Sequence, residues 1–218
     1  MIIFPFADDN AKKDFPFITL FLIIVNFLIF FGFALRNDYQ VIVSIYGFTP
    51  NEFSWFTLFS SLFLHADFLH LLLNMWFFWL FGGSLEASLG KVCYLAIFII
   101  GGLVAGIMHM VLVDVAGKSI PCIGASGAVS AVMGGYFIFF PRAKLKLFVW
   151  LWFWIKTFKC SAFVFLGLWF LQEFFLAALA GSVSEVIRLA YGAHIGGFIF
   201  GLCFAYMLKG FFLDSNQD

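Results

Sequence analysis

One serine, two histidines and one asparagine could carry out chemistry together in this sequence. Ser126 offers a hydroxyl nucleophile, and His194 offers a neutral imidazole that can accept the hydroxyl proton. When a hydroxyl attacks a peptide carbonyl, the charge that develops on the oxygen needs hydrogen-bond donors already in place. His70 and Asn74 are four residues apart and share a helix face, and the free amide of Ser126 at a helix start is a third donor. This set predicts hydrolysis of a peptide bond by a serine nucleophile.

A serine triad would also need a carboxylate that orients the base, His194. Asp67 and Asp114 fall near the ends of apolar segments, and Glu173 falls inside another segment. No sequence spacing ties any of the three to His194. We therefore predict a dyad of Ser126 and His194.

The composition requires that lipid surround most of the chain. Of the 218 residues, 64% are hydrophobic and 11% are charged, and the mean hydropathy of +1.05 is too high for a soluble domain of this length. The formal net charge of zero gives no reason to expect nucleic acid as a partner. The four cysteines are scattered without metal-binding spacing, so we expect no metal and no cofactor.

Six apolar segments are long enough to cross a bilayer core of about 30 Å, which takes ~20 helical residues. They lie at 17–35, 67–83, 91–115, 123–141, 161–180 and 189–208. We predict an all-α membrane protein with a cytoplasmic tail at 1–16, a six-helix domain at 17–208 and a second tail at 209–218. Residues 36–65 are expected to form an interfacial loop, packed on protein, where irregular backbone is tolerated. Residues 144–159 fit either an interfacial helix or an early start of the fifth span.

The uneven distribution of lysine and arginine between the loops predicts the orientation. With the N-terminus in the cytoplasm, nine of these residues lie inside and three lie outside. The inner set is Lys12, Lys13, Lys91, Arg142, Lys144, Lys146, Lys156, Lys159 and Lys209, and the outer set is Arg36, Lys118 and Arg188. Both termini are therefore expected in the cytoplasm. A bacterial inner (plasma) membrane is the simplest location for so compact a chain.

This orientation places the candidate reactive groups at one depth. His70 and Asn74, Ser126, and His194 each lie roughly 4–11 Å below the outer end of their helix, at about 1.5 Å rise per residue. Strongly polar side chains at membrane depth are costly, which favours a functional role. We expect a site that opens to the outer side through a cavity, because hydrolysis needs water.

Small residues explain how two of these helices could approach each other. They recur at intervals of four in the fourth and sixth segments, and each set forms a smooth stripe on one helix face. The stripes are Gly127, Ala131 and Gly135 in one segment and Ala193, Gly197 and Gly201 in the other. Close packing of the two stripes would let the serine side chain reach the imidazole.

The motifs that carry these residues resemble those of the rhomboid family of intramembrane serine proteases. HADFLHLLLN at 65–74, GASG at 124–127 and AHIGGFIFG at 193–201 occur in the order of the family, and GSLEASLG at 83–90 matches the end of its second helix. The resemblance implies a six-helix rhomboid core and cleavage of a transmembrane or juxtamembrane peptide bond. It implies that Ser126 is the nucleophile, that His194 is the general base, and that His70 and Asn74 are oxyanion donors.

The resemblance also implies supporting residues and an entry route. His65 is expected to hold the structure of the site, and Gly124, Gly127 and Gly197 to support it. Substrate helices, the expected partners besides membrane lipid, would enter laterally near the second and fifth segments. The candidate gate residues there are Phe77, Phe78, Trp169 and Phe170.

The sequence departs from the family pattern at two places. Ser130 stands where many members carry an aromatic ring that stacks on the catalytic histidine, and Phe56 follows Trp55 where many members have an arginine. The first departure leaves open what positions His194. The second leaves open how the first loop is anchored.

Two other functions fit parts of the pattern. A catalytically silent rhomboid-like protein that binds and escorts membrane helices usually lacks the serine or the histidine, and this chain keeps both. A proton or metal conductor would use His65, His70 and His194. His65 and His70 are five residues apart, about 140° around a helix, so they do not converge on one ion.

Overall fold

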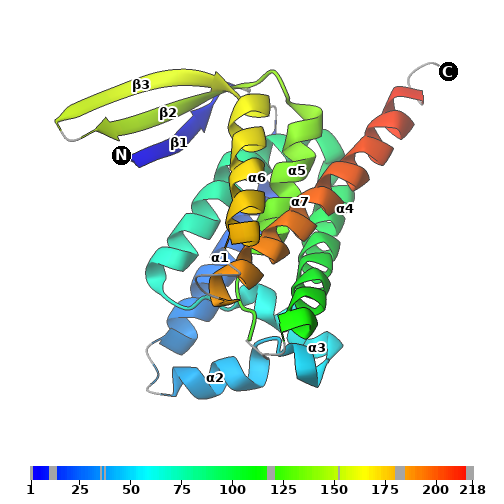
Figure 1. Cartoon of the computed structure of the whole chain (residues 1–218). Helices are drawn as coiled ribbons and strands as arrows, with labels where there is room; N and C mark the ends of the chain where they lie inside the picture. The colour runs from blue at the N-terminus through cyan, green and yellow to red at the C-terminus, as the bar shows by residue number, and fades with distance from the viewer. Residues whose placement is uncertain are drawn as a thin grey trace.

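The computed structural model describes residues 2–9, 14–34, 36, 38–116, 121–151, 153–179 and 185–214. Most of them are helical, and a three-stranded sheet lies at one end of the helices (Figure 1). In chain order the strands and α-helices are β1 (Ile2–Asp8), α1 (Phe17–Ala34), α2 (Tyr39–Tyr46), α3 (Trp55–Ser60), α4 (Phe68–Ala116), α5 (Ser126–Phe139), β2 (Lys144–Leu151), β3 (Trp154–Ser161), α6 (Ala162–Leu179) and α7 (Glu185–Asp214).

Helix α4 consists of two apolar helices joined at Gly90. The backbone of Gly90 has a φ of 71°, a left-handed conformation that glycine adopts without a steric penalty. The chain reverses direction at Gly90. As a result, Phe78 before the break packs against Tyr94 and Phe98 after it, with ring centroids 6.2 and 4.9 Å apart. The second predicted segment ended at residue 83, but the helix continues to the break.

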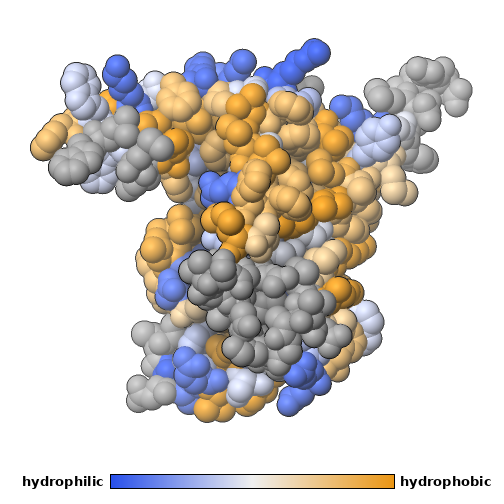
Figure 2. Space-filling model, viewed as in Figure 1, coloured by the Kyte–Doolittle hydropathy of each residue, from blue (hydrophilic) through white to orange (hydrophobic). Residues whose placement is uncertain are grey.

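Three helical stretches of the described chain are long and apolar enough to cross a membrane: Phe68–Val111, Ala162–Leu179 and Tyr191–Gly210. Two shorter apolar helices, Phe17–Phe33 and Ser126–Phe139, accompany them. On the face shown in Figure 2, hydrophobic residues cover the middle of the molecule and hydrophilic residues gather toward its two ends. The prediction of a membrane protein is confirmed.

The segment after α1 is largely helical, in place of the irregular backbone that we expected. Between α2 and α4 it contains α3 and two 3₁₀ turns, Pro50–Glu52 and Ser61–Phe63. It is joined to the residues ahead of α5 by backbone hydrogen bonds. Phe48 and Cys122 exchange two, of 3.1 and 2.8 Å, and the Gly124 N–H donates to the Ser61 carbonyl oxygen at 2.9 Å. The segment therefore holds the approach to α5 in place.

The sheet corrects the all-α prediction. Its antiparallel strands follow the order β1-β2-β3, so the described residues of 144–159 form neither an interfacial helix nor the start of α6. The sequence carries a signal for a strand here, because lysine and leucine alternate in the KLKL that opens β2. Leu145 and Leu147 are buried, whereas Lys144 and Lys146 are not.

Strand β1 packs on the helices, which corrects the predicted tail at 1–16 for residues 2–8. Trp76 Nε1 on α4 donates a 2.8 Å hydrogen bond to the carbonyl oxygen of Pro5. The Asp8 carboxylate accepts hydrogen bonds from the hydroxyls of Ser84 and Tyr136, at 3.1 and 2.9 Å. Strand β1 therefore fastens the sheet to α4 and α5. At the other terminus, α7 extends beyond the predicted boundary at 208.

The two ends of the bundle carry different elements. The sheet and the C-terminal part of α7 lie at one end, and α2 and α3 lie at the other (Figure 1). Three of the residues that were counted for the orientation, Lys12, Lys13 and Lys118, lie outside the described residues. The side of the membrane that each end faces stays a prediction.

A buried carboxylate holds the N-terminus of α1. The backbone N–H groups of Ile18 and Thr19 donate to the Glu86 carboxylate at 2.8 Å each, and the Thr19 hydroxyl donates to it at 2.7 Å. The Thr19 hydroxyl also lies 2.8 Å from the Tyr94 hydroxyl, which donates to it. The first N–H groups of a helix lack intrahelical acceptors and lie at the positive end of the helix dipole, so a carboxylate is stabilised there.

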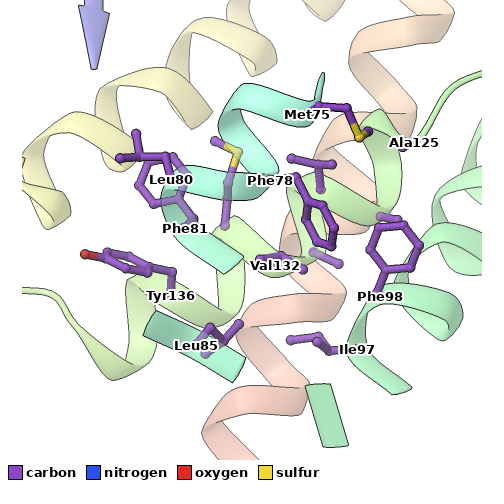
Figure 3. Packing of buried hydrophobic residues seen from close by; sticks show 14 of the residues in the cluster. Met75, Phe78, Leu80, Phe81, Leu85, Ile97, Phe98, Ala125, Val132 and Tyr136 are labelled. Carbon is purple, nitrogen blue, oxygen red and sulfur yellow. The ribbon is translucent and has the colours of Figure 1, made fainter. Parts of the chain in front are cut away.

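The hydrophobic core lies between α4 and α5, as Figure 3 shows. Phe78, Phe81, Phe98 and Tyr136 are fully buried in it. The rings of Phe81 and Tyr136 meet edge to face with their centroids 5.0 Å apart, a favourable arrangement for aromatic pairs. This core fixes α5 against both halves of α4.

Helices α5 and α7 touch backbone to backbone. A Cβ on Gly197 would collide with the carbonyl oxygen of Gly127, and a Cβ on Gly201 would collide with that of Ala131. The pairing advances four residues on both helices, so they run parallel and in register. The predicted stripe on α7 therefore lies against the backbone of α5. The predicted stripe on α5 faces α4 instead, because a Cβ on Gly127 would meet Ala105, a Cβ on Gly101 would meet Ala131, and a Cβ on Gly135 would meet Leu85 and Ile97.

Replacement of Gly201 by alanine should destabilise the protein. The new methyl group has no room against the Ala131 carbonyl, and such overpacking costs about 1–3 kcal/mol. Gly167 on α6 has no neighbouring atom within 4 Å of its Cβ position, so Gly167→Ala is a matched control that should be neutral or slightly stabilising. Thermal unfolding in detergent, followed by circular dichroism, compares the variants. Equal midpoints for the two would contradict the close contact.

Candidate active site

A cavity of about 210 Å³ between α4, α5, α6 and α7 gathers the residues predicted for chemistry. Ser126 from α5, His194 from α7, and His70 and Asn74 from α4 all line it. The other lining residues are Leu73, Phe77, Val129, Ser130, Met133, Trp169 and Glu173. Side chains from distant parts of the sequence therefore meet in one small, largely apolar space.

The α5–α7 contact brings Ser126 and His194 to the same cavity. Ser126 is the first residue of α5, and the next residue, Gly127, touches α7 at Gly197. Gly197 follows His194 by three residues, so the histidine lies about one helical turn before the contact. The amide of Ser126 is among those that a helix N-terminus leaves without an intrahelical acceptor.

Gly124 makes room for a histidine beside the serine. A Cβ at this position would lie 2.9 Å from Cε1 and 3.0 Å from Nε2 of His70, and 3.8 Å from Ser126 Oγ. The imidazole of His70 and the serine hydroxyl therefore flank the same point. Gly124 also has a φ of 124°, which side chains rarely permit, so glycine is required for both space and backbone conformation.

Local hydrogen bonds orient His70 and Asn74. The Asp67 carboxylate accepts the N–H of His70 at 2.8 Å and caps the N-terminus of α4. The N–H of Ala66 points to His70 Nδ1 at 3.4 Å, which favours the tautomer with its proton on Nε2, the nitrogen beside Gly124. Asn74 Nδ2 donates to the His70 carbonyl oxygen at 3.0 Å, and its second hydrogen is left for another acceptor.

His65 lies behind His70 and does not line the cavity. It is 1% exposed, and its ring meets the His70 ring edge to face at 5.2 Å. The Tyr39 hydroxyl donates to the backbone carbonyl of His65. Burial, with a smaller contribution from His70, lowers the pKa of His65 to about 3, so its ring stays neutral near pH 7. This placement fits the supporting role implied by the motif.

Sequence spacing failed to identify a carboxylate beside His194. Glu173 on α6 lies with Oε2 at 2.9 Å from His194 Nδ1, and the two side chains are 7% and 22% exposed. The two residues are 21 positions apart, and the connection from α6 to α7 lies between them, so no helical periodicity relates the two positions. The one feature of the sequence that could have indicated this contact is that Glu173 is an acidic residue inside a predicted membrane span.

An aromatic ring approaches His194 from α6 rather than from α5. The centroid of Trp169 is 6.4 Å from that of His194, and the two ring planes are inclined by 31°. Ser130, where many relatives were expected to have an aromatic residue, is buried at the cavity. Trp169 is therefore the aromatic neighbour of His194 among the described residues that line the cavity.

The four gate candidates divide into two pairs. Phe77 and Trp169 line the cavity. Phe78 is fully buried against the second half of α4, so its predicted place at the gate is wrong. The ring of Phe170 stacks on Phe198 of α7, with centroids 5.0 Å apart, and is not part of the cavity lining. Neighbouring residues of a helix point in different directions, and the sequence pattern did not separate them.

A model of the Rhomboid domain matches residues 52–211, which is more than half of the chain and includes every residue of the cavity lining. The chain belongs to the rhomboid family. Its match begins in the segment after α1 and ends near the C-terminus of α7.

Individual rhomboid relatives are between a quarter and a third identical to this chain over the residues that align. Rhomboid protein 1, mitochondrial, of Saccharomyces cerevisiae is 29% identical over 69% of this chain and 41% of its own length. Presenilin-associated rhomboid-like protein A, mitochondrial, of Danio rerio is 28% identical over 65% of this chain and 34% of its own length. Rhomboid protease GlpG of Salmonella choleraesuis is 26% identical over 94% of this chain and 67% of its own length. The chain thus spans less than half the length of the two mitochondrial relatives.

Acid should destabilise this rhomboid through His65. The pKa of this residue is about 3 in the folded protein and about 6.5 in an unfolded chain, so the unfolded state takes up the proton first as the pH falls. The free energy of unfolding should therefore decrease from about pH 6.5 toward about pH 3. Thermal unfolding at stepped pH would measure this dependence. His65→Phe should show a flatter profile than the wild type, and identical slopes would contradict a buried neutral histidine.

Proposed function

We propose that this rhomboid is an intramembrane serine endopeptidase that cleaves transmembrane or juxtamembrane peptide bonds of membrane proteins. The main support is the meeting of Ser126, His194, His70 and Asn74 around one cavity. These four supply a nucleophile, a base and donors for an oxyanion, which are the parts that acyl transfer needs. The name of the Salmonella relative as a protease supports the same activity.

In the proposed reaction Ser126 Oγ attacks the carbonyl carbon of the substrate while its proton passes to His194. The negative charge on the former carbonyl oxygen is met by the Ser126 amide, by His70 Nε2–H and by the Asn74 side-chain amide. His194 then gives its proton to the leaving nitrogen as the C–N bond breaks, which leaves an ester on Ser126. Water, deprotonated by His194, attacks this ester and releases the second product.

The proposed arrangement in the membrane has six spans: α1, the two halves of α4, α5, α6 and α7. Both termini lie in the cytoplasm, and the cavity opens to the outer side, from which water enters. This topology follows the bias of lysine and arginine between the loops. The relatives include mitochondrial and bacterial proteins, so they support a membrane location without favouring a bacterial inner membrane.

The proposed substrates are membrane-spanning helices that enter laterally. Phe77 on α4 and Trp169 on α6 lie on two sides of the cavity lining and form the proposed gate. A substrate segment that reaches the serine between them must unwind locally, since a peptide carbonyl inside a regular helix is hydrogen-bonded within it. Membrane lipid surrounds the remaining outer faces, and neither nucleic acid nor metal takes part.

Cleavage should depend on Ser126 and His194 and not on the second cavity serine. Purified protein in liposomes is mixed with a reporter transmembrane peptide that carries a fluorophore and a quencher. Ser126→Ala and His194→Ala should each abolish cleavage, with losses of about 10⁴-fold or more. Ser130→Ala is the matched control, because Ser130 also lines the cavity, and it should retain activity. Full activity of Ser126→Ala would exclude the serine mechanism.

The same experiment tests the escort alternative. A catalytically silent protein would bind the reporter without cleaving it, and Ser126→Ala would leave the binding unchanged. Binding is measured by energy transfer between the labelled protein and the labelled peptide. Binding without cleavage by the wild-type protein would favour the escort function over the proposed protease.

Removal of an oxyanion donor should lower kcat with little effect on KM. Asn74→Leu keeps the number and branching of the side-chain heavy atoms but removes the amide, so the transition state loses a donor that the bound substrate does not use. We expect kcat to fall by about 10²–10³-fold. Leu73→Ala, which also alters the cavity lining, serves as the control and should mainly change KM. A selective rise of KM in Asn74→Leu would contradict the role of this residue in the transition state.

A further inference from the structure

We propose that Glu173 is a positioning residue that converts the pair of Ser126 and His194 into a triad. This inference rests on the proposed function, and it replaces the predicted dyad. It starts from the 2.9 Å contact between Glu173 Oε2 and His194 Nδ1, in which the carboxylate is 7% exposed. With Nδ1 as the donor to Glu173, the lone pair of the neutral ring lies on Nε2, where a base for Ser126 needs it.

The position of Glu173 on α6 supports a specific role. Only three α6 residues are buried, namely Ala162, Leu166 and Glu173, and Glu173 is the only charged residue of the helix. An isolated carboxylate in apolar surroundings is costly unless a partner compensates for it. The described partner of Glu173 is His194, so the one charged side chain of α6 contacts the proposed base.

The second contact from α6 acts on the same imidazole. Trp169 and Glu173 are four residues apart and share a helix face, and both line the cavity. Trp169 lies beside the ring, whereas Glu173 binds its Nδ1 edge. Together they restrain the ring in place of the aromatic residue that is absent at Ser130. Among the described residues of the cavity lining, the one other ionisable group is His70 on α4.

The chemistry needs no proton on Glu173. When Ser126 Oγ bonds to the substrate carbonyl, the hydroxyl proton moves to Nε2 and the ring becomes an imidazolium with N–H on both nitrogens. The Glu173 carboxylate faces the Nδ1–H and stabilises the positive charge without accepting the proton. The Nε2 proton then leaves with the amine as the C–N bond breaks. Glu173 therefore contributes most when His194 is charged.

The first test compares Glu173→Gln and Glu173→Asp with the wild type by measuring kcat and KM for the reporter peptide across pH. Glu173→Gln should lower kcat by about 10²-fold or more with KM within about twofold, because the tautomer and the charge are affected rather than substrate binding. The acid limb of its profile should move to lower pH, since the neutral amide favours imidazolium less than the carboxylate does. Glu173→Asp should recover part of kcat and keep the acid limb near that of the wild type.

A matched control and a stability measurement separate positioning from packing. Gln172→Ala alters the exposed neighbour of Glu173 and should leave kcat and the pH profile unchanged. Thermal unfolding in detergent shows whether each variant is folded at the assay temperature. If Glu173 only holds α6 against α7, the midpoint falls while the acid limb of the folded fraction stays in place. That outcome would overturn the proposal.

The second test does not depend on catalysis. ¹⁵N-histidine spectra of the Ser126→Ala protein in micelles report which nitrogen of His194 carries the proton, and His194→Gln assigns its signals. We expect the proton on Nδ1, and loss of this preference in the Ser126→Ala, Glu173→Gln double variant. An unchanged tautomer together with an unchanged kcat would overturn the triad while the protease function stands. Absence of cleavage by the wild type would overturn both, and the spectra would then define the pair as a structural contact only.

Discussion

The backbone contact between α5 and α7 is the constraint on which the rest of the structure depends. Lipid provides little hydrophobic drive for two apolar helices to associate, so close packing and polar contacts must hold them together. Gly197 and Gly201 remove the side chains that would separate the backbones. The contact runs in register and ends beside Ser126 and His194. Helices α4 and α6 then add the remaining cavity residues from both sides.

Three buried or half-buried carboxylates show one physical rule in this apolar chain. Glu86 caps α1, Asp8 accepts two hydroxyls from α4 and α5, and Glu173 faces an imidazole. Each carboxylate joins segments that are distant in sequence. A carboxylate without a partner would be costly in these surroundings, so these groups specify which segments meet. The polar contacts therefore define the tertiary arrangement that the apolar faces alone leave open.

The sequence predicted the cluster of Ser126, His194, His70 and Asn74 because helix geometry and span boundaries place polar groups at calculable depths. It did not reveal Glu173, because the contact crosses a connection whose path no periodicity determines. The sheet was missed for a different reason. Its strands are rich in aromatic residues and border a span, so their apolar content matched a helix, and only the alternation in KLKL argued otherwise. The burial of Phe78 was not predicted, because a membrane-spanning helix is apolar on every face and its sequence does not show which face packs on protein.

The pairing of β1 with β2 has a consequence for the order in which the protein can be completed during synthesis. Strand β1 leaves the ribosome well before its partner, which begins at Lys144, after α1, α4 and α5 have been made. The edge of β1 must therefore stay unpaired while most of the bundle enters the membrane, and unpaired strand edges are prone to wrong associations. Closure of the sheet is therefore a long-range step that joins β1 to strands made after α1, α4 and α5.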